Sequence, residues 1–176
     1  RVTNLAKPDL VLLAGDFVIH GVVGGHFVEP EASARALRSL QAPLGVYAVL
    51  GNHDWWFDGA RVRKALEDEG IPVLEDRAIP LMFNQMSFWL AGVSDFWEGA
   101  HDVRRALKTV DGVNPVILMT HNPDIFPEIP KRVALTIAGH THGGQVAVPG
   151  WGRPVVPSHF GERYAMGHIV EGGRHL

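Results

Sequence analysis

The chain has 176 residues, of which 46% are hydrophobic and 20% are charged. We therefore expect a single globular domain over residues 1–176, and this balance excludes disordered and fibrous proteins. The formal net charge of -3 gives no overall basic character for contacting the phosphates of a nucleic acid. No apolar run approaches the roughly 18 to 20 residues of a membrane helix. Because the chain has no cysteine, disulfides and thiolate metal sites are excluded.

Apolar runs and helical patterns alternate through the first part of the chain. Two continuous apolar runs predict strands that are covered on both faces, residues 10–14 and 46–50. Apolar residues at helical spacing predict two surface helices, residues 30–40 and 58–69. Three further strands are predicted over residues 72–74, 79–83 and 87–92, with Asn84 and Gln85 in a hairpin turn between the last two.

The second part of the chain continues the same alternation. A weaker helical pattern covers residues 100–110, and two more buried strands are predicted over residues 115–120 and 133–138. Residues 143–176 are rich in Gly and Pro, with strands predicted over residues 165–170 and from residue 174 onward. Alternating strands and helices predict an α/β layered fold with the helices outside the sheet.

Polar side chains follow four of the predicted buried strands. They are Asp16, Asn52 with His53, His121, and His140 with His142. Because ligands of α/β proteins bind at the carboxyl ends of strands, we expect these side chains to form one site. Carboxylate, amide and imidazole groups without thiolate suit Mn, Fe, Zn or Co.

The spacing of the histidines suggests more than one metal ion. His140 and His142 could reach two adjacent ions from a loop, with Asp16 bridging them. Two ions about 3.5 to 4 Å apart can hold a bridging hydroxide and clamp the attacking and leaving oxygens of a phosphoryl displacement. Hydrolysis of a phosphate ester is therefore the predicted reaction.

The same residues occur in an ordered set of motifs. In chain order these are Gly-Asp at 15–16, Gly-Asn-His-Asp at 51–54, His121, and Gly-His-Thr-His at 139–142. They resemble four of the five motifs of calcineurin-like metallophosphoesterases. The extended motifs resemble the bacterial branch of often membrane-associated phosphodiesterases, over residues 47–56, 120–124, 138–145 and 161–164. The resemblance implies a layered β-sandwich flanked by α-helices.

The resemblance also implies a role for each site residue. The metal ligands would be Asp16, Asn52, His121, His140 and His142. Asp16 would bridge the ions, and His142 would belong to the first of the two metal sites. A metal-bridging hydroxide would attack phosphorus while His53 contacts the phosphate and protonates the leaving alkoxide. Asp54 would orient His53, and Asp95 would lie at the periphery.

The chain departs from the family pattern at its start. The family's first motif, Asp-x-His, should precede Asp16, but residues 1–14 contain no His. We therefore expect an incomplete domain that lacks its first strand and, beyond Leu176, a last one. The longer parent would bind two divalent or trivalent ions (Mn, Fe, Zn or Co), and a single ion is left open for this chain. Membrane association would require a segment before Arg1, and the compartment is not assigned.

The predicted function is a metal-dependent phosphoester hydrolase that acts on a small phosphodiester or pyrophosphate. The alternative is a metal-binding remnant or scaffold without turnover. The short chain after His140 argues against an amidohydrolase barrel, and Gly143-Gly144 argues against a metallo-β-lactamase-like fold. Four aromatic residues near the motifs could form an apolar wall for a substrate or pack in the core: Trp55, Trp56, Phe57 and Trp97.

Overall fold

A short parallel sheet forms near the N-terminal end of the chain. The computed structural model describes residues 2–21, 24–145, 150 and 155–176. After helix α1 (Val2–Leu5), strand β1 (Val11–Leu13) pairs in parallel with β2 (Val46–Ala48). A parallel bridge between Ala48 and Val73 continues this sheet beyond β2. The predicted strands at residues 10–14 and 46–50 are thereby confirmed, each with slightly narrower bounds.

A second sheet has four strands in the order β3-β4-β5-β6. Strands β3 (Arg77–Phe83) and β4 (Met86–Gly92) are antiparallel, whereas β5 (Val116–Met119) and β6 (Val133–Ile137) continue the sheet in parallel. Asn84 and Gln85 join β3 to β4 with φ values of 47° and 68°. Two successive left-handed residues are the geometry of a tight hairpin turn, which confirms the predicted hairpin.

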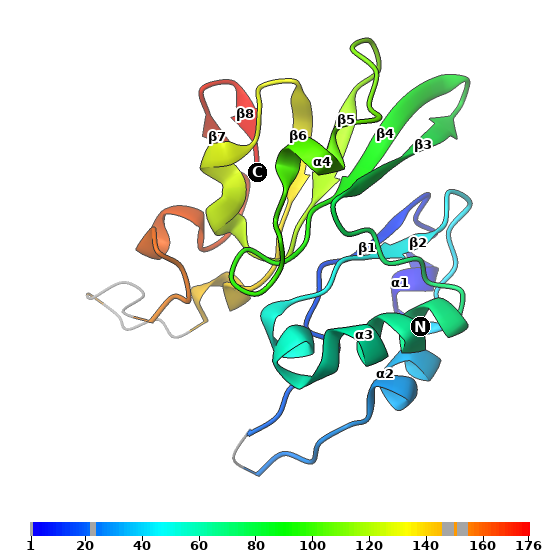
Figure 1. Ribbon diagram of the computed structural model, residues 1–176, viewed down its shortest axis with the longest axis vertical. Helices are drawn as coiled ribbons and strands as arrows, with labels where there is room; N and C mark the ends of the chain where they lie inside the picture. The colour runs from blue at the N-terminus through cyan, green and yellow to red at the C-terminus, as the bar shows by residue number, and fades with distance from the viewer. Residues whose placement is uncertain (1, 22–23, 146–149, 151–154) are drawn as a thin grey trace.

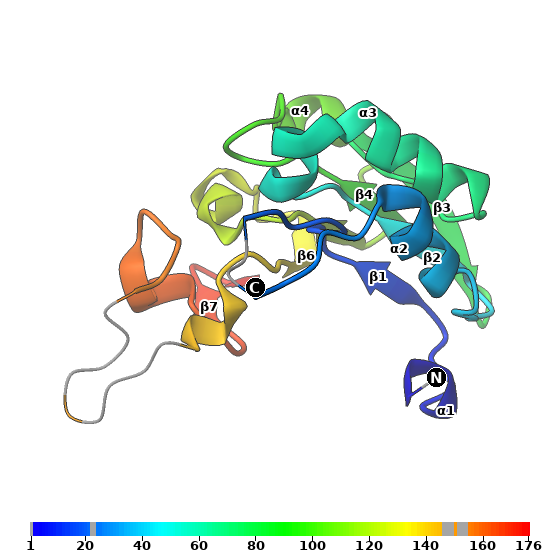
Figure 2. The same ribbon diagram turned by 90° about the horizontal axis from the view of Figure 1, so that it is seen from below.

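Helices cover the outer faces of both sheets. Helices α2 (Pro30–Leu37) and α3 (Asn52–Asp68) pack on the first sheet, below β1 and β2 in Figure 1. Helix α4 (Val103–Ala106) and the 3-10 helix η1 (Pro123–Glu128) pack against the second sheet. Figure 2 shows α2 and α3 beside the sheets from a second direction. The predicted layered β-sandwich flanked by helices is confirmed.

Strand β5 shows how alternate side chains serve two different cores. Val116 and Leu118 face the core under α4 and η1. Ile117 and Met119 face the core between the two sheets. A strand with both faces buried needs an unbroken apolar run, which explains why the sequence of β5 lacks polar alternation.

Helix α3 begins earlier than the sequence pattern predicts. It starts at Asn52 and contains a break at Asp58, whose φ of -170° and ψ of 88° are not helical. The Asp58 carboxylate accepts the backbone N–H of Arg61 at 3.0 Å, which is how an aspartate caps the start of a helix. The predicted start at residue 58 therefore describes the second segment of α3. Its first turn was missed because residues 52–57 serve the site and lack a simple apolar stripe.

The C-terminal part carries short elements. The 3-10 helices η2 (His142–Gly144) and η3 (Gly161–Tyr164) precede a small hairpin of β7 (Val170–Glu171) and β8 (Arg174–His175). The strand predicted over residues 165–170 is wrong except at its last residue, because residues 165–167 form bends after η3 and β7 begins only at Val170. The helix predicted over residues 100–110 is likewise confined to α4. No helix within the described ranges has the length and apolar character to cross a membrane.

Candidate metal centre

Four strand ends bring polar side chains together at the junction of the two sheets. Asp16 follows β1 and Asn52 follows β2 in the first sheet, whereas His121 follows β5 and His140 follows β6 in the second. Asp16, His121 and His140 each offer one ligand atom, and these atoms lie within 4.8 Å of one another. The sequence placed the same three residues in one site.

The Nε2 atom of His121 is at the centre of this group. It lies 3.1 Å from Asn52 Oδ1, 3.1 Å from His140 Nδ1 and 3.3 Å from Asp16 Oδ2. The other ring nitrogen of His121, Nδ1, donates to the carbonyl oxygen of Ala14 at 2.5 Å. A backbone acceptor on one nitrogen fixes the ring and aims the second nitrogen at a ligand, as in many protein metal sites.

The side chains of the group shift one another's pKa values. Burial by itself raises the pKa of Asp16, but the hydrogen bond and charge of His121 outweigh it, and the pKa is lowered. Burial lowers the pKa of His121, yet the contact with Asp16 outweighs it and the pKa is raised. Burial and the neighbouring His121 lower the pKa of His140 to about 4, so this imidazole is neutral at pH 7 and has one ring nitrogen with a free lone pair.

The donor atoms of the group are of the kinds that transition metals bind. His140 faces the group with Nδ1, which lies 3.1 Å from His121 Nε2. The other nitrogen of its ring, Nε2, is buried without a hydrogen-bond partner among the described residues. One carboxylate, one amide oxygen and two imidazoles form the mixed oxygen and nitrogen set that Mn, Fe, Zn or Co accept. These residues therefore fit a bound transition-metal ion.

The backbone around the group is tightly packed and strained. A Cβ atom on Gly51 would lie 2.2 Å from Asp16 Oδ1, so only glycine leaves space for that carboxylate. Asp16 and His140 have φ values of 60° and 66°, in the left-handed region that costs L-residues energy. Backbone strain of this kind is concentrated at functional sites because the surrounding structure holds the side chains in place.

Asp54 holds the loop that carries Asp16. Its Oδ1 accepts the N–H groups of Phe17 and Val18 at 2.7 and 3.1 Å, and its Oδ2 accepts those of Asp16 and Gly51, both at 2.9 Å. The family resemblance implies that Asp54 orients His53, whereas the hydrogen-bond partners of its carboxylate are backbone N–H groups of residues 16–18 and 51. The available signal was its position three residues after Gly51, where a helix residue reaches back to the cap.

His53 lies beside the metal-ligand group without belonging to it. Its backbone N–H donates to Asp16 Oδ1 at 3.1 Å, and its half-buried ring packs edge-on against Trp56 with 4.8 Å between ring centroids. His142 is exposed and is not among the residues whose ligand atoms converge. Asp95 is buried, and its Oδ2 accepts the N–H groups of Trp97 and Glu98. This structural role of Asp95 carries no signal in the sequence.

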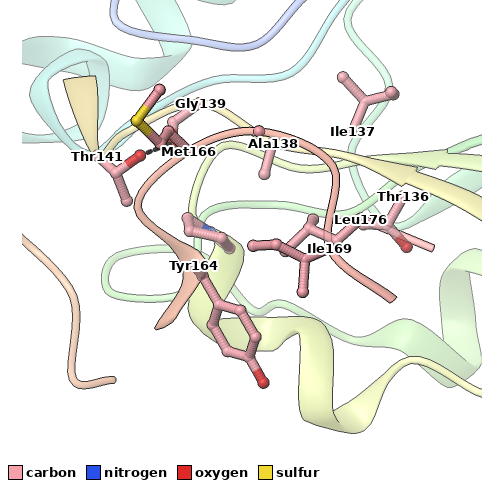
Figure 3. Close-up of a pocket in the computed structure, with 11 residues that line it drawn as sticks. Thr136, Ile137, Ala138, Gly139, Thr141, Tyr164, Met166, Ile169 and Leu176 are labelled. Carbon is pink, nitrogen blue, oxygen red and sulfur yellow. Dashed lines mark hydrogen bonds between the residues drawn. The ribbon is translucent and has the colours of Figure 1, made fainter. Parts of the chain in front are cut away.

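A small cavity lies behind the loop that carries His140. Its volume is about 150 Å³, and Figure 3 shows Ala138, Gly139 and Thr141 along one side of it. Tyr164 and Met166 also line the cavity, with Met166 next to Thr141 in Figure 3, and the Thr141 hydroxyl donates to the carbonyl oxygen of Ala165 at 2.8 Å. This volume is below the range of about 300 to 1,000 Å³ that is usual for ligand pockets. The cavity therefore marks where the C-terminal segment supports the loop.

A family model for calcineurin-like phosphoesterases matches residues 1–144, which include the whole metal-ligand group. The chain belongs to this family. It is 33% identical to an uncharacterized metallophosphoesterase of Aquifex aeolicus, over 86% of this chain and 57% of that protein. It is 31% identical to the phosphodiesterase YaeI of Escherichia coli, over 97% of this chain and 62% of that protein. The chain thus spans about three fifths of the length of these relatives.

A solved structure shows the same family fold. The NAD nucleotidase of Haemophilus influenzae matches with a TM-score of 0.52 and 23% identity. The match covers 76% of this chain and 33% of that one. At this identity the likeness establishes the layered phosphoesterase fold and nothing about the substrate.

Proposed function

We propose that this phosphoesterase chain hydrolyses a small phosphodiester or pyrophosphate with the help of bound transition-metal ions. The observation that carries the proposal is that three possible metal-ligand atoms lie close to His121 Nε2. They are Asn52 Oδ1, His140 Nδ1 and Asp16 Oδ2. The relative named as a phosphodiesterase, which matches 97% of this chain, supports the choice of a diester.

Four side chains would hold the metal: Asp16, Asn52, His121 and His140. Asp16 supplies the negative charge, and the three neutral donors complete a set of mixed oxygen and nitrogen ligands. When bound, such ions activate water and neutralise charge on the phosphoryl oxygens. The Ala14 carbonyl orients His121, and Asp54 fixes the loop of Asp16, so both ligands are held before any ion or substrate arrives. His142, placed by the resemblance at a first metal site, is exposed and would act only with further ligands.

His53 is the proposed proton donor to the leaving oxygen. Its backbone is bound to Asp16, which places the imidazole next to the metal ligands, and its ring is held on one side by Trp56. An imidazolium can give a proton to an alkoxide as the ester bond breaks. The part of Asp54 in this scheme is positioning: it holds the backbone on both sides of the site.

The test measures metal content and turnover separately. The chain is incubated with Mn²⁺, desalted and examined by elemental mass spectrometry, and hydrolysis of bis(4-nitrophenyl) phosphate is followed in parallel. Asp16→Asn and His140→Ala should lose both the retained Mn²⁺ and the turnover. His53→Ala should keep the metal and lose about 10² to 10⁴ in rate on a diester with an alkyl leaving group, whose alkoxide needs the proton. On bis(4-nitrophenyl) phosphate the loss should be smaller, because 4-nitrophenolate leaves without protonation.

The test also needs a control variant and an outcome that would refute the ligand assignment. His168 is exposed and contacts His175, so His168→Ala removes a histidine that faces away from the proposed chemistry. This variant should match the unmodified chain in metal content and rate. Retained Mn²⁺ without turnover would favour the alternative of a metal-binding scaffold. Equal Mn²⁺ content in Asp16→Asn and the unmodified chain would refute the ligand assignment.

A further inference from the structure

Two tryptophans form an exposed aromatic surface beside the candidate metal centre. Trp56 lies in the first segment of α3 and is 47% exposed, and Trp97 lies in the turn after β4 and is 37% exposed. Their rings are 6.4 Å apart between centroids and are inclined by only 22°. We call these two side chains the aromatic platform.

The platform touches both functional parts of the proposed site. The ring of Trp56 meets His53, the proposed proton donor, with 4.8 Å between centroids. The ring of Trp97 meets His140, a proposed metal ligand, with 4.5 Å between centroids and an angle of 90°. An organic group attached to a phosphate that is bound between His53 and His140 would therefore start next to these two indoles.

Core packing does not account for the platform. Trp55, which precedes Trp56 in the sequence, is partly buried against the core under α3, close to Gly59. Trp56, one residue later, lies on a different face of the helix and is exposed. Adjacent exposed apolar side chains are characteristic of binding surfaces.

Hydrogen bonds hold the platform in a fixed orientation. The indole N–H of Trp56 donates to Glu98 Oε1 at 2.6 Å. The turn that carries Trp97 and Glu98 is itself fixed, because the backbone N–H groups of these two residues donate to the buried carboxylate of Asp95. A surface fixed before binding loses little conformational entropy when a ligand arrives. The carboxylate of Glu98 at the edge of the platform also disfavours a second anionic group there.

We infer that the platform binds a flat, uncharged aromatic part of the substrate, an aryl group or a nucleobase, attached to the phosphoester at the metal centre. The inference rests on the proposed hydrolase function and adds a substrate class to it. Stacking of a base on an aromatic side chain contributes about tenfold or more to affinity. The two indole planes are nearly parallel, so a flat group can stack on the exposed face of either ring, which an alkyl chain cannot do.

The first measurement is binding, which does not depend on turnover. Calorimetric titration of the Mn²⁺-loaded chain compares phenylphosphonate with methylphosphonate, so that the anionic head group is shared. The phenyl compound should bind about tenfold more tightly. Trp56→Leu keeps apolar bulk but removes the flat ring, and should abolish most of this preference. Trp56→Phe, the matched variant, keeps a ring and should retain most of it.

The second measurement is the ratio of kcat/KM for phenyl 4-nitrophenyl phosphate and methyl 4-nitrophenyl phosphate, which release the same 4-nitrophenolate. The unmodified chain should favour the phenyl ester, and Trp56→Leu should lower the ratio about tenfold. Turnover of both esters at equal rates would refute the proposed role of the platform but would still agree with the hydrolase function. A phenyl preference in binding without turnover of either ester would reject the hydrolase and support the platform. If Trp56→Leu keeps the full phenyl preference, the inference is wrong.

Discussion

Gly51→Ala should damage the metal centre although the backbone at this position is ordinary. Gly51 caps helix α3 with φ of -102° and ψ of 175°, an extended conformation that alanine also adopts. The requirement for glycine is therefore one of space alone. An added Cβ would lie 2.2 Å from Asp16 Oδ1 and 2.8 Å from His121 Cε1.

The size of the effect follows from these contacts. Ordinary contact begins at 3.4 Å, so the Asp16 carboxylate must move by about 1.2 Å relative to the new methyl group. Metal ligands tolerate only about 0.2 Å of change in distance. The affinity for Mn²⁺ should therefore fall at least about tenfold, the loss that even an outer partner of a ligand can cause. Overpacking should also lower the free energy of unfolding by about 1 to 3 kcal/mol.

The assay compares two glycines with opposite surroundings. No atom lies within 4 Å of a Cβ built on Gly112, and its φ is not in the left-handed region. Gly112→Ala is thus the matched control, and should be neutral or slightly stabilising. Calorimetry with Mn²⁺ and urea denaturation are applied to both variants. Equal Mn²⁺ affinity and equal unfolding free energy in the two variants would refute the argument from space.

Three further predictions concern stability. Burial is the main cause that raises the pKa of Glu75 to about 6, against the opposing charge of Arg63. The folded protein then keeps a proton that the unfolded chain has released between pH 4.5 and 6, so this group lowers stability as the pH rises through that window. Relative to the unmodified chain, Glu75→Gln should gain about 2 kcal/mol between pH 4.5 and 7.5 in urea denaturation, and a constant difference would contradict this. Asp54→Ala should lower the free energy of unfolding by about 4 kcal/mol or more, because four backbone N–H groups lose their acceptor. A urea midpoint close to that of the unmodified chain would show that these hydrogen bonds do not stabilise the fold. Asp58→Ala should cost about 1 kcal/mol through loss of the cap on Arg61, read as a small shift in thermal melting, with no shift arguing against capping.

The sequence predicted the strands of the site better than its helix. Strands β1, β2 and β5 have unbroken apolar runs because both faces pack in a core, and a polar side chain of the site follows each run. Strand β6 is mostly apolar but contains Thr136 and an exposed Ala134. The start of α3 was not predictable in the same way. Its first turn is organised by Asp54 and the metal-ligand group, so its side chains do not follow the period of a helix packed on a core.

Some site residues could likewise be predicted from the sequence, and others could not. Asp16, His121 and His140 were predicted to share a site because strand ends meet at one edge, and the structure brings their ligand atoms together. His142 shares the motif with His140 but is exposed, since the left-handed backbone at both residues turns the loop between them. The difference between Trp55 in the core and Trp56 on the surface depends on the helix orientation, which apolar character alone does not reveal.

The placement of the ligands at the junction of the two sheets has a consequence for unfolding. Asp16 and Asn52 belong to the first sheet, and His121 and His140 belong to the second. An ion held by all four would cross-link segments that are distant along the chain, much as a covalent bridge does. Neither sheet could then open without releasing the ion, so metal binding would merge the two sheets into one cooperative unfolding unit.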